Sequence, residues 1–263
     1  MYNKNSKENP YKLAVLGATF TGCGLANIIN NSIVLERGAA PGYEYAHAFY
    51  GGKKWDLEIK TPLANKFQNE CLHRNIVNRD KIHIPALIPL LSTMLKGIST
   101  RFKFLTEIIS WNYINNLFEI EISNFSGIER LFAQKIIDTR SAESMLISKF
   151  YNALLHSPVP EEPDGNYSGN TVSTGLFPAQ YILSIPLAPK TSWPQARNAL
   201  HAFWKNRDKK LQNLFLSASG TEFACLCRPG PEVINNIILL PSTAYDNPAQ
   251  SMEAGEKHAE EMI

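Results

Sequence analysis

The chain has 263 residues, of which 44% are hydrophobic and 19% are charged, and its formal net charge at pH 7 is +2. This composition excludes an intrinsically disordered chain, and the small net charge gives no electrostatic basis for binding nucleic acid. No run approaches the roughly 18 consecutive apolar residues of a membrane-spanning helix, so no membrane span is expected. Residues 1–11 lack the apolar core of a signal peptide and are expected to form a loose tail.

The four cysteines indicate a reducing compartment. Their positions, 23, 71, 225 and 227, form neither a disulfide framework nor a four-ligand zinc pattern. Cys225 and Cys227 would lie on the same face of a strand, where a buried apolar pair is favoured over a metal site. We therefore expect a cytoplasmic protein without a metal centre.

The N-terminal segment is typical of a nucleotide-binding unit. An apolar strand is predicted at 12–16, followed by a glycine-containing turn, a helix that ends near residue 30, and a second apolar strand at 32–35. Glu36 stands at the end of this second strand, 19 residues after Gly17. This order of strand, turn, helix, strand and acidic residue predicts a dinucleotide site at the carboxyl ends of the strands.

Each part of this unit has a physical role. Gly17 would permit a tight turn, and Gly22 would let the helix lie close to the strand. The free N–H groups at the helix N-terminus would face a pyrophosphate, and Glu36 would accept hydrogen bonds from the ribose hydroxyls. Thr19 stands where the G-x-G-x-x-G fingerprint has its second glycine, so the pyrophosphate is expected slightly farther from the turn. The cofactor contacts expected in this unit are Gly17, Ala18, Thr19, Phe20, Thr21, Gly22, Glu36 and Arg37.

The rest of the chain alternates helices and strands around a β-rich segment. Residues 38–60 are expected to form a loop because of their glycines and prolines. The elements predicted after this loop are helices at 62–73 and 85–96 and strands at 101–109, 118–122, 131–133 and 135–138. The β-rich segment is predicted to contain strands at 148–155 and 180–187, an exposed loop at 156–175, a helix from the N-cap Ser192 to about residue 210, and a hairpin of 214–219 with 222–227. A last strand at 235–240 and a helix at 249–262 close the chain.

Three blocks of this order carry a family resemblance. They are the unit at 17–36, the apolar strand that ends in 139–141 (Thr-Arg-Ser in place of Ala-Thr-Gly), and the C-terminal strand with its turn at Asp246 and final helix. Over 12–145 and 234–263 the chain resembles the glutathione-reductase-like superfamily of FAD-dependent oxidoreductases, in a compact form with one dinucleotide motif. The resemblance implies an α/β fold, with a Rossmann-like FAD-binding domain and a small β-rich substrate or cap lobe inserted before the C-terminal strand and helix.

The same resemblance implies domain limits and further cofactor contacts. The FAD-binding domain would comprise 1–145 and 230–263, and the lobe would comprise 146–229. In this family the late aspartate, here Asp246, bonds the ribityl or pyrophosphate part of FAD, and the N-terminus of the last helix faces the flavin ring. Asp246 or Asn247 would cap this helix, with a proline at its first position. The additional contacts expected are Ile108, Thr139, Asp246, Asn247 and Pro248.

The implied function is an FAD-dependent oxidoreductase that acts on a small organic substrate and passes electrons through the flavin to oxygen or a partner. Two alternatives stay open: an FAD-binding or degenerate flavoprotein-like subunit with a mainly structural role in a larger assembly, and an NAD(P)-binding Rossmann reductase. The four residues between Gly17 and Gly22 disfavour the last, since short-chain NAD(P) reductases have three there. A homo-oligomer or a partner subunit would help to close the pocket. The substrate contacts expected are His47, Arg74, Tyr181 and Arg197, and no catalytic residue is assigned.

Overall fold

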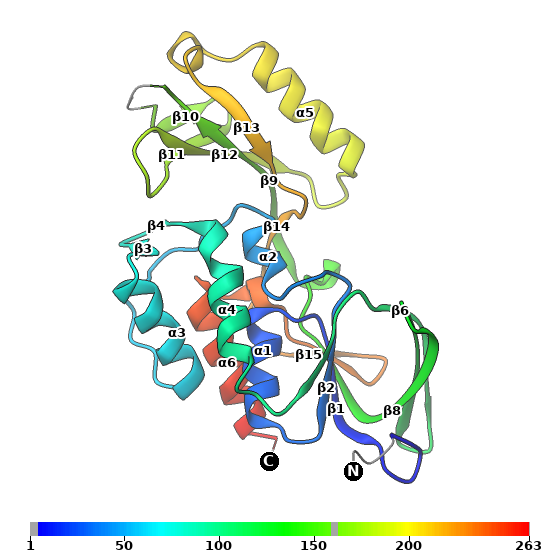
Figure 1. Cartoon of the computed structure of the whole chain (residues 1–263). Helices are drawn as coiled ribbons and strands as arrows, with labels where there is room; N and C mark the ends of the chain where they lie inside the picture. The colour runs from blue at the N-terminus through cyan, green and yellow to red at the C-terminus, as the bar shows by residue number, and fades with distance from the viewer. Residues whose placement is uncertain (1–4, 159–162, 263) are drawn as a thin grey trace.

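The computed structural model describes residues 5–158 and 163–262, which form a larger α/β part and a smaller β-rich lobe (Figure 1). The larger part contains a mixed sheet in the order β15-β16-β8-β1-β2-β5, to which β7 and β6 add beside β8. Its strands are β1 (Tyr11–Leu16), β2 (Ser32–Leu35), β5 (Arg101–Lys103), β6 (Glu107–Ile114), β7 (Leu117–Asn124), β8 (Gly127–Asp138), β15 (Glu232–Ile234) and β16 (Ile237–Leu239). Strand β1 pairs in parallel with β2 and β8, which confirms the predicted parallel unit.

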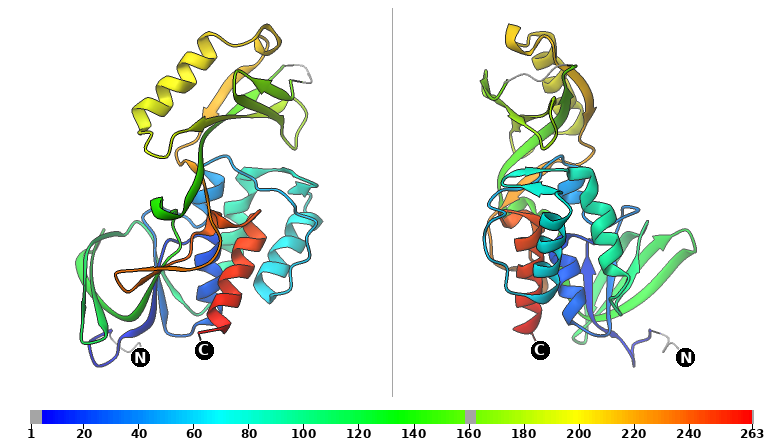
Figure 2. Two further views of the ribbon diagram at one scale, coloured as in Figure 1. Left: turned by 180° about the vertical axis from the view of Figure 1, so that it is seen from behind. Right: turned by 60° about the vertical axis from the view of Figure 1, so that its left-hand side comes forward.

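Burial on both faces explains the continuous apolar run of β1. Leu13 and Val15 pack with the helices on one face, whereas Ala14 and Leu16 pack with the strands of the β6–β8 meander on the other. Figures 1 and 2 show helices α1, α3, α4 and α6 gathered on one side of the sheet, with the meander on the other side. The strand is therefore buried like the central strand of a parallel sheet, as its sequence predicts.

Four helices cover this face of the sheet: α1 (Phe20–Ile28), α3 (Pro62–His73), α4 (Leu87–Leu95) and α6 (Pro248–Glu260), within the described part of the chain. The loop predicted at 38–60 contains a short helix, α2 (Tyr43–Ala46). A small hairpin of β3 (Val77–Asn78) with β4 (Lys81–Ile82) and a 3-10 turn, η1 (Ile84–Ala86), precede α4. None of the described helices is both long and apolar enough to cross a bilayer.

The lobe is a second sheet in the order β10-β11-β12-β9-β13, with β14 also paired to β9. Its elements are β9 (Leu146–His156), β10 (Gly165–Tyr167), β11 (Asn170–Thr174), β12 (Gln180–Leu187), α5 (Trp193–Lys205), β13 (Phe215–Ser219) and β14 (Ala224–Cys227). The 3-10 turn η2 (Glu143–Met145) precedes β9, and the 3-10 turn η3 (Lys209–Leu211) follows α5. Helix α5 lies along this sheet, away from the larger part (Figure 1). Ser192 caps α5 in a capping box with Gln195, which confirms the predicted N-cap.

Several sequence predictions were wrong in this region, for identifiable reasons. The loop expected at 156–175 holds the hairpin β10–β11, which turns through Ser168 and Gly169, both at positive φ; residues 159–162 of that prediction lie outside the described residues. The hairpin expected from 214–219 and 222–227 does not form, because β13 and β14 both pair with the long strand β9 and not with each other. Non-local pairing of this kind leaves no signal in either short strand.

Two strands of the larger part also differ from their predictions. The strand expected at 101–109 is divided at Leu105, which has φ 52°; β5 pairs with β2, and β6 pairs with β7. The strand expected at 235–240 is a hairpin in which Asn235 and Asn236 form the turn. Conversely, the segments predicted at 131–133 and 135–138 are one continuous strand, β8.

The chain returns from the lobe to the first sheet, as predicted. Strand β16 pairs in parallel with β8, with Ile238 opposite Ile137, and α6 then packs against α1 and α3. The lobe is thus inserted before the C-terminal strand and helix, which confirms the predicted fold class. Residues 1–11 are expected to form a loose tail, but the part that the structure describes contacts β8. The Asn5 side chain donates to the Phe132 carbonyl (3.0 Å) and accepts from the Phe132 N–H (2.8 Å).

Candidate functional site

A groove of about 620 Å³ lies where β2 and β8 end and where the lobe meets the larger part. Its volume is in the range of small-molecule and cofactor sites. The residues that line it are Thr19, Glu36, Arg37, Gly38, Tyr43, Glu44, His47, Glu107, Asp138, Arg140, Ser141, Ala142, Thr221, Glu222, Phe223 and Cys225. A second groove, of about 650 Å³, runs along α6 between Leu57 and His258, and none of its lining residues is among the sequence-predicted contacts. The groove at the strand ends is therefore the candidate site.

The turn after β1 is built around Gly17 and Glu36. Gly17 has φ 94°, a conformation that residues with a side chain rarely adopt, and its N–H donates to the Leu35 carbonyl (2.8 Å). The Glu36 carboxylate accepts from the Ala18 N–H (2.8 Å) and from the Gly38 N–H (2.5 Å). The expected acidic residue thus lies beside the glycine turn and lines the groove.

The Thr19 side chain is engaged in hydrogen bonds within the protein. Thr19 is the N-cap of α1, and its hydroxyl accepts from the Gly22 N–H (3.0 Å) and donates to Thr139 Oγ1 (2.7 Å). Thr139 is fully buried and donates to the carbonyls of Leu16 (2.9 Å) and Gly17 (3.2 Å). Thr19 and Thr139, the two threonines at which this chain departs from the resembled motifs, therefore form one hydrogen-bonded pair that joins the turn after β1 to the end of β8.

We expect Thr19→Gly to lower the free energy of unfolding by about 1–2 kcal/mol, because it removes the cap of α1 and the donor to Thr139. Thr19→Ser keeps the hydroxyl and is the matched control, with an expected loss below about 0.5 kcal/mol. The midpoints of urea denaturation measure both values. Equal midpoints for the two variants would show that the hydroxyl is unimportant for folding.

The N–H groups at the start of α1 are occupied by side chains, contrary to the free donors predicted from the sequence. The Phe20 N–H donates to Glu44 Oε1 (2.8 Å), and the Thr21 N–H donates to Ser242 Oγ (3.3 Å). The Ser242 hydroxyl also donates to Glu44 Oε1 (2.8 Å). Burial raises the pKa of Glu44 to about 7, although its hydrogen bonds from the Phe20 N–H and Ser242 act in the opposite direction. An acidic group thus sits where an anion was expected.

Carboxylates dominate the charge of the groove. The acidic lining residues are Glu36, Glu44, Glu107, Asp138 and Glu222. Arg140 forms an ion pair with Asp138 (2.7 Å), which raises the pKa of the guanidinium, and Arg37 pairs with Glu222 (3.1 Å). Both lining arginines are therefore neutralised by groove carboxylates.

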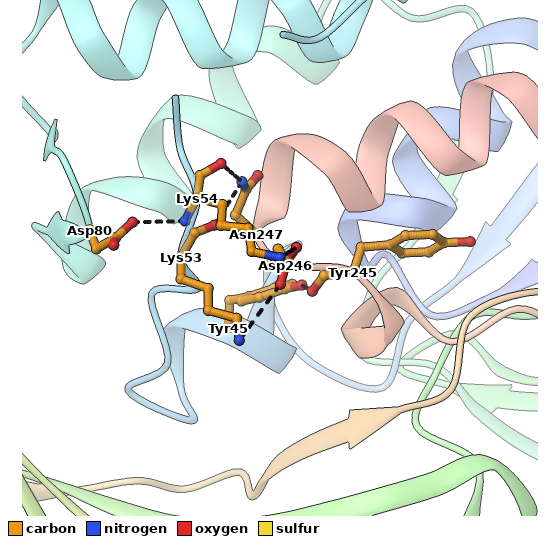
Figure 3. Close-up of polar contacts among 7 residues, drawn as sticks. All are labelled: Tyr45, Lys53, Lys54, Asp80, Tyr245, Asp246 and Asn247. Carbon is orange, nitrogen blue, oxygen red and sulfur yellow. Dashed lines mark hydrogen bonds and ion pairs between the residues drawn. The ribbon is translucent and has the colours of Figure 1, made fainter. Parts of the chain in front are cut away.

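The C-terminal contacts predicted for the cofactor are not among the residues that line the groove. Figure 3 shows the polar contacts that Asp246 and Asn247 make instead. Asp246 forms ion pairs with Lys54 (2.8 Å) and Lys53 (3.8 Å). Asn247 caps α6 by accepting from the Gln250 N–H (3.0 Å), and its amide donates to the carbonyls of both lysines (3.1 Å each). Pro248 is the first residue of α6 and is buried. This block therefore joins the loop at 52–54 to the start of α6. Ser242, between β16 and α6, contacts the first turn of α1.

The other predicted contacts are dispersed. Ile108 packs against the apolar core beside β7. His47 lines the groove, where it stacks on Tyr43 at 3.8 Å between ring centroids and its Nδ1 lies 2.9 Å from Thr221 Oγ1. Arg74 is at the exposed end of α3, Tyr181 belongs to the lobe core, and Arg197 is exposed on α5. Of the four substrate candidates, the structure therefore brings only His47 to the groove.

Sequence reasoning missed Glu44, Asp138 and Ser242. Asp138 and Ser242 had a usable signal, since they are polar residues at or just after strands that join the same sheet edge. Glu44 had none, because its partners Phe20 and Ser242 are 24 and 198 residues away. Cys225 lines the groove and Cys227 is buried, with a bulge between Leu226 and Cys227, and no group of three or more metal-binding side chains occurs among the described residues.

Comparisons with known proteins identify the fold. No protein-family model matches the chain, and no curated protein matches it in sequence. Among solved structures, BexE, studied for oxidation during BE-7585A biosynthesis, has a TM-score of 0.61 at 15% identity, with 95% of this chain and 60% of that chain covered. Aklavinone-11 hydroxylase in complex with FAD and aklavinone has a TM-score of 0.58 at 9% identity, with 98% and 63% covered. OxyS anhydrotetracycline hydroxylase from Streptomyces rimosus has a TM-score of 0.53 at 13% identity, with 95% and 60% covered.

These likenesses concern architecture. The chain spans about three fifths of the length of these three proteins. At identities of 9–15%, the similarity establishes a shared fold and assigns no substrate. The α/β part and the lobe therefore share their fold with these proteins, one of which, aklavinone-11 hydroxylase, is described with FAD.

Proposed function

We propose that this protein is an FAD-dependent oxidoreductase that acts on a small organic substrate, and that the groove at the ends of β2 and β8 holds the cofactor. The observation that carries this proposal is the position of Glu36 beside the Gly17 turn, at the edge of a parallel unit completed by β16. Ligands of such sheets bind outside the carboxyl ends of the strands. The same fold in a hydroxylase described with FAD adds support.

The residues present suit the adenosine half of FAD. The Glu36 carboxylate is only partly buried and retains acceptor capacity for the two ribose hydroxyls beyond its bonds to Ala18 and Gly38. The pyrophosphate half would face the N-terminus of α1, where the N–H groups of Phe20, Thr21 and Gly22 now donate to Glu44, Ser242 and Thr19. FAD thus fits the groove if its pyrophosphate exchanges with one of these side chains.

Bound FAD would supply the electron transfer, and the protein supplies orientation and proton-bearing groups. Residues of the lobe segment 221–225 line the groove together with Glu36 and Thr19 of the α/β part, so a substrate held there would lie between the lobe and the α/β part. The N–H groups of Thr221 (2.9 Å) and Glu222 (3.2 Å) donate to the His47 carbonyl and fix this segment. His47 is then positioned by Tyr43 and Thr221 and can exchange a proton with a substrate in the groove.

The visible absorption spectrum of the purified protein, recorded after incubation with FAD and removal of free flavin, tests this proposal. We expect flavin bands that remain with the protein. Their absence, together with retention of NAD(P), would favour the Rossmann reductase. Retention of neither would favour a structural subunit.

Glu36→Gln is expected to weaken FAD binding by about 1–3 kcal/mol, because an amide accepts less strongly from ribose hydroxyls and has one acceptor oxygen for two backbone N–H groups. Glu107→Gln, which removes a charge from the same groove on a different strand, β6, is the matched control. Titration of each variant with FAD, followed by flavin fluorescence, gives the affinities. An equal change in both variants would assign the effect to groove charge and not to ribose recognition.

A further inference from the structure

We propose that Glu44 gates the seat of the FAD pyrophosphate at the N-terminus of α1, so that cofactor binding takes up a proton. This inference rests on the proposed FAD site and adds a regulatory residue to it. Neither a sequence motif nor the fold comparison points to Glu44. The two carboxylate oxygens of Glu44 differ sharply in their surroundings.

One oxygen holds the donors that an anion would use. Glu44 Oε1 accepts from the Phe20 N–H (2.8 Å) and from the Ser242 hydroxyl (2.8 Å), which in turn accepts from the Thr21 N–H (3.3 Å). The N-terminal N–H groups of a helix bind phosphate through hydrogen bonds and the helix dipole. A phosphate oxygen and Oε1 cannot both take the Phe20 N–H in good geometry. Pyrophosphate binding therefore requires Glu44 to release it.

The other oxygen has no partner. Glu44 Oε2 is inaccessible to solvent and makes no hydrogen bond within the described residues. A buried carboxylate oxygen without a donor is costly when ionised, whereas a protonated one carries an O–H that needs an acceptor. A pyrophosphate oxygen beside Glu44 would supply that acceptor. The neutral acid would thus be a hydrogen-bond donor to the cofactor, and the ionised acid would repel it.

The groups facing Glu44 do not offset its charge. Glu36 at the end of β2 adds negative charge, and Cys23 on α1 and Tyr45 on α2 are buried with raised pKa values, so both remain neutral near pH 7. On the groove, Arg140 is paired with Asp138. His47 also lines the groove and carries an ionisable imidazole, so it needs its own control.

The direction of the pH effect follows from these contacts. Burial raises the pKa of Glu44 to about 7, so the side chain is largely neutral below that pH and largely ionised above it. Because the proposed binding mode requires neutral Glu44, the Kd for FAD increases as pH rises, by up to about tenfold for each pH unit above the pKa of Glu44. The phosphates of FAD are diesters without the second ionisation near pH 6 of a monoester, so the ligand itself does not titrate in this range.

The test is a titration with FAD, followed by flavin fluorescence, from about pH 6 to about pH 8.5. We expect the Kd of the unaltered protein to rise about tenfold per unit above pH 7. Glu44→Gln should make the Kd nearly independent of pH and, at the highest pH, at least about tenfold lower than that of the unaltered protein. Glu107→Gln and His47→Gln are the controls and should keep the pH dependence. Adenosine, which lacks the pyrophosphate, should bind with little pH dependence in every variant.

A second measurement avoids reliance on the folding of the variant. Calorimetric titration of the unaltered protein with FAD near pH 8, in buffers of different ionisation enthalpy, should show uptake of close to one proton per FAD bound. FAD binding without proton uptake, or with the same pH profile in Glu44→Gln, would overturn the role of Glu44 and leave the proposed function standing. Failure of FAD to bind at any pH, in both the unaltered protein and Glu44→Gln, would instead overturn the proposed function and this inference with it.

Discussion

Replacement of Glu256 by alanine is expected to lower the free energy of unfolding by about 3–5 kcal/mol, a large part of the stability of a typical protein. Glu256 lies on α6, is fully buried, and accepts from the Thr61 hydroxyl (2.6 Å) and from the Leu63 (3.1 Å) and Ala64 (3.0 Å) N–H groups. It also accepts from the Asn27 amide of α1 (2.9 Å). Its carboxylate therefore caps α3 from another helix, and alanine would leave these donors buried without an acceptor.

Urea denaturation with a shared m-value provides the measurement, with an expected fall in the midpoint of about 1–2 M. Glu260→Ala is the matched control, because this glutamate is exposed on the last turn of the same helix, and its expected effect is below about 0.5 kcal/mol. If the two variants had similar midpoints, α3 would not depend on the Glu256 cap.

Gly24→Val is expected to destabilise the protein by about 3 kcal/mol, because α1 and α6 touch through their backbones at this point. A Cβ at Gly24 would lie 2.2 Å from the Met252 carbonyl oxygen, and a Cβ at Gly255, across the contact, would lie 2.1 Å from the Thr21 carbonyl oxygen. A side chain forces the helices apart, and valine requires more separation than alanine. The loss should therefore increase in the order glycine, alanine, valine, although both replacements raise helix propensity.

Gly97→Val is the control, since the nearest atom to its added Cβ lies 3.8 Å away. Its expected effect is within about 0.5 kcal/mol. The same variants report on the site, because α1 carries the Phe20 and Thr21 donors and Ser242 is held by Ser251 of α6 (2.6 Å). We expect Gly24→Val to weaken FAD binding as well. Unchanged stability would mean that α6 can move away from α1 without cost.

Local sequence signals were sufficient wherever one element carries its own pattern. The apolar runs predicted β1 and β2, Pro62 and Ser192 marked helix starts, and the acidic residue after β2 was found at the groove. These predictions succeeded because burial on both faces, capping and strand-end position are properties of a few neighbouring residues. Thr19 and Thr139 were recognised as departures from a motif, but their mutual hydrogen bond was not predictable from either.

What the sequence determined by itself is therefore the class of fold: a parallel unit with a glycine turn and Glu36, interrupted by a β-rich lobe and completed by a last strand and helix. The tertiary structure alone decided which strands pair with β9, which acid occupies the N-terminus of α1, and which glutamate caps α3. The physical reason is distance along the chain. Glu44 reaches Phe20 across 24 residues and Glu256 reaches Ala64 across 192, so their hydrogen bonds exist only after the helices have packed.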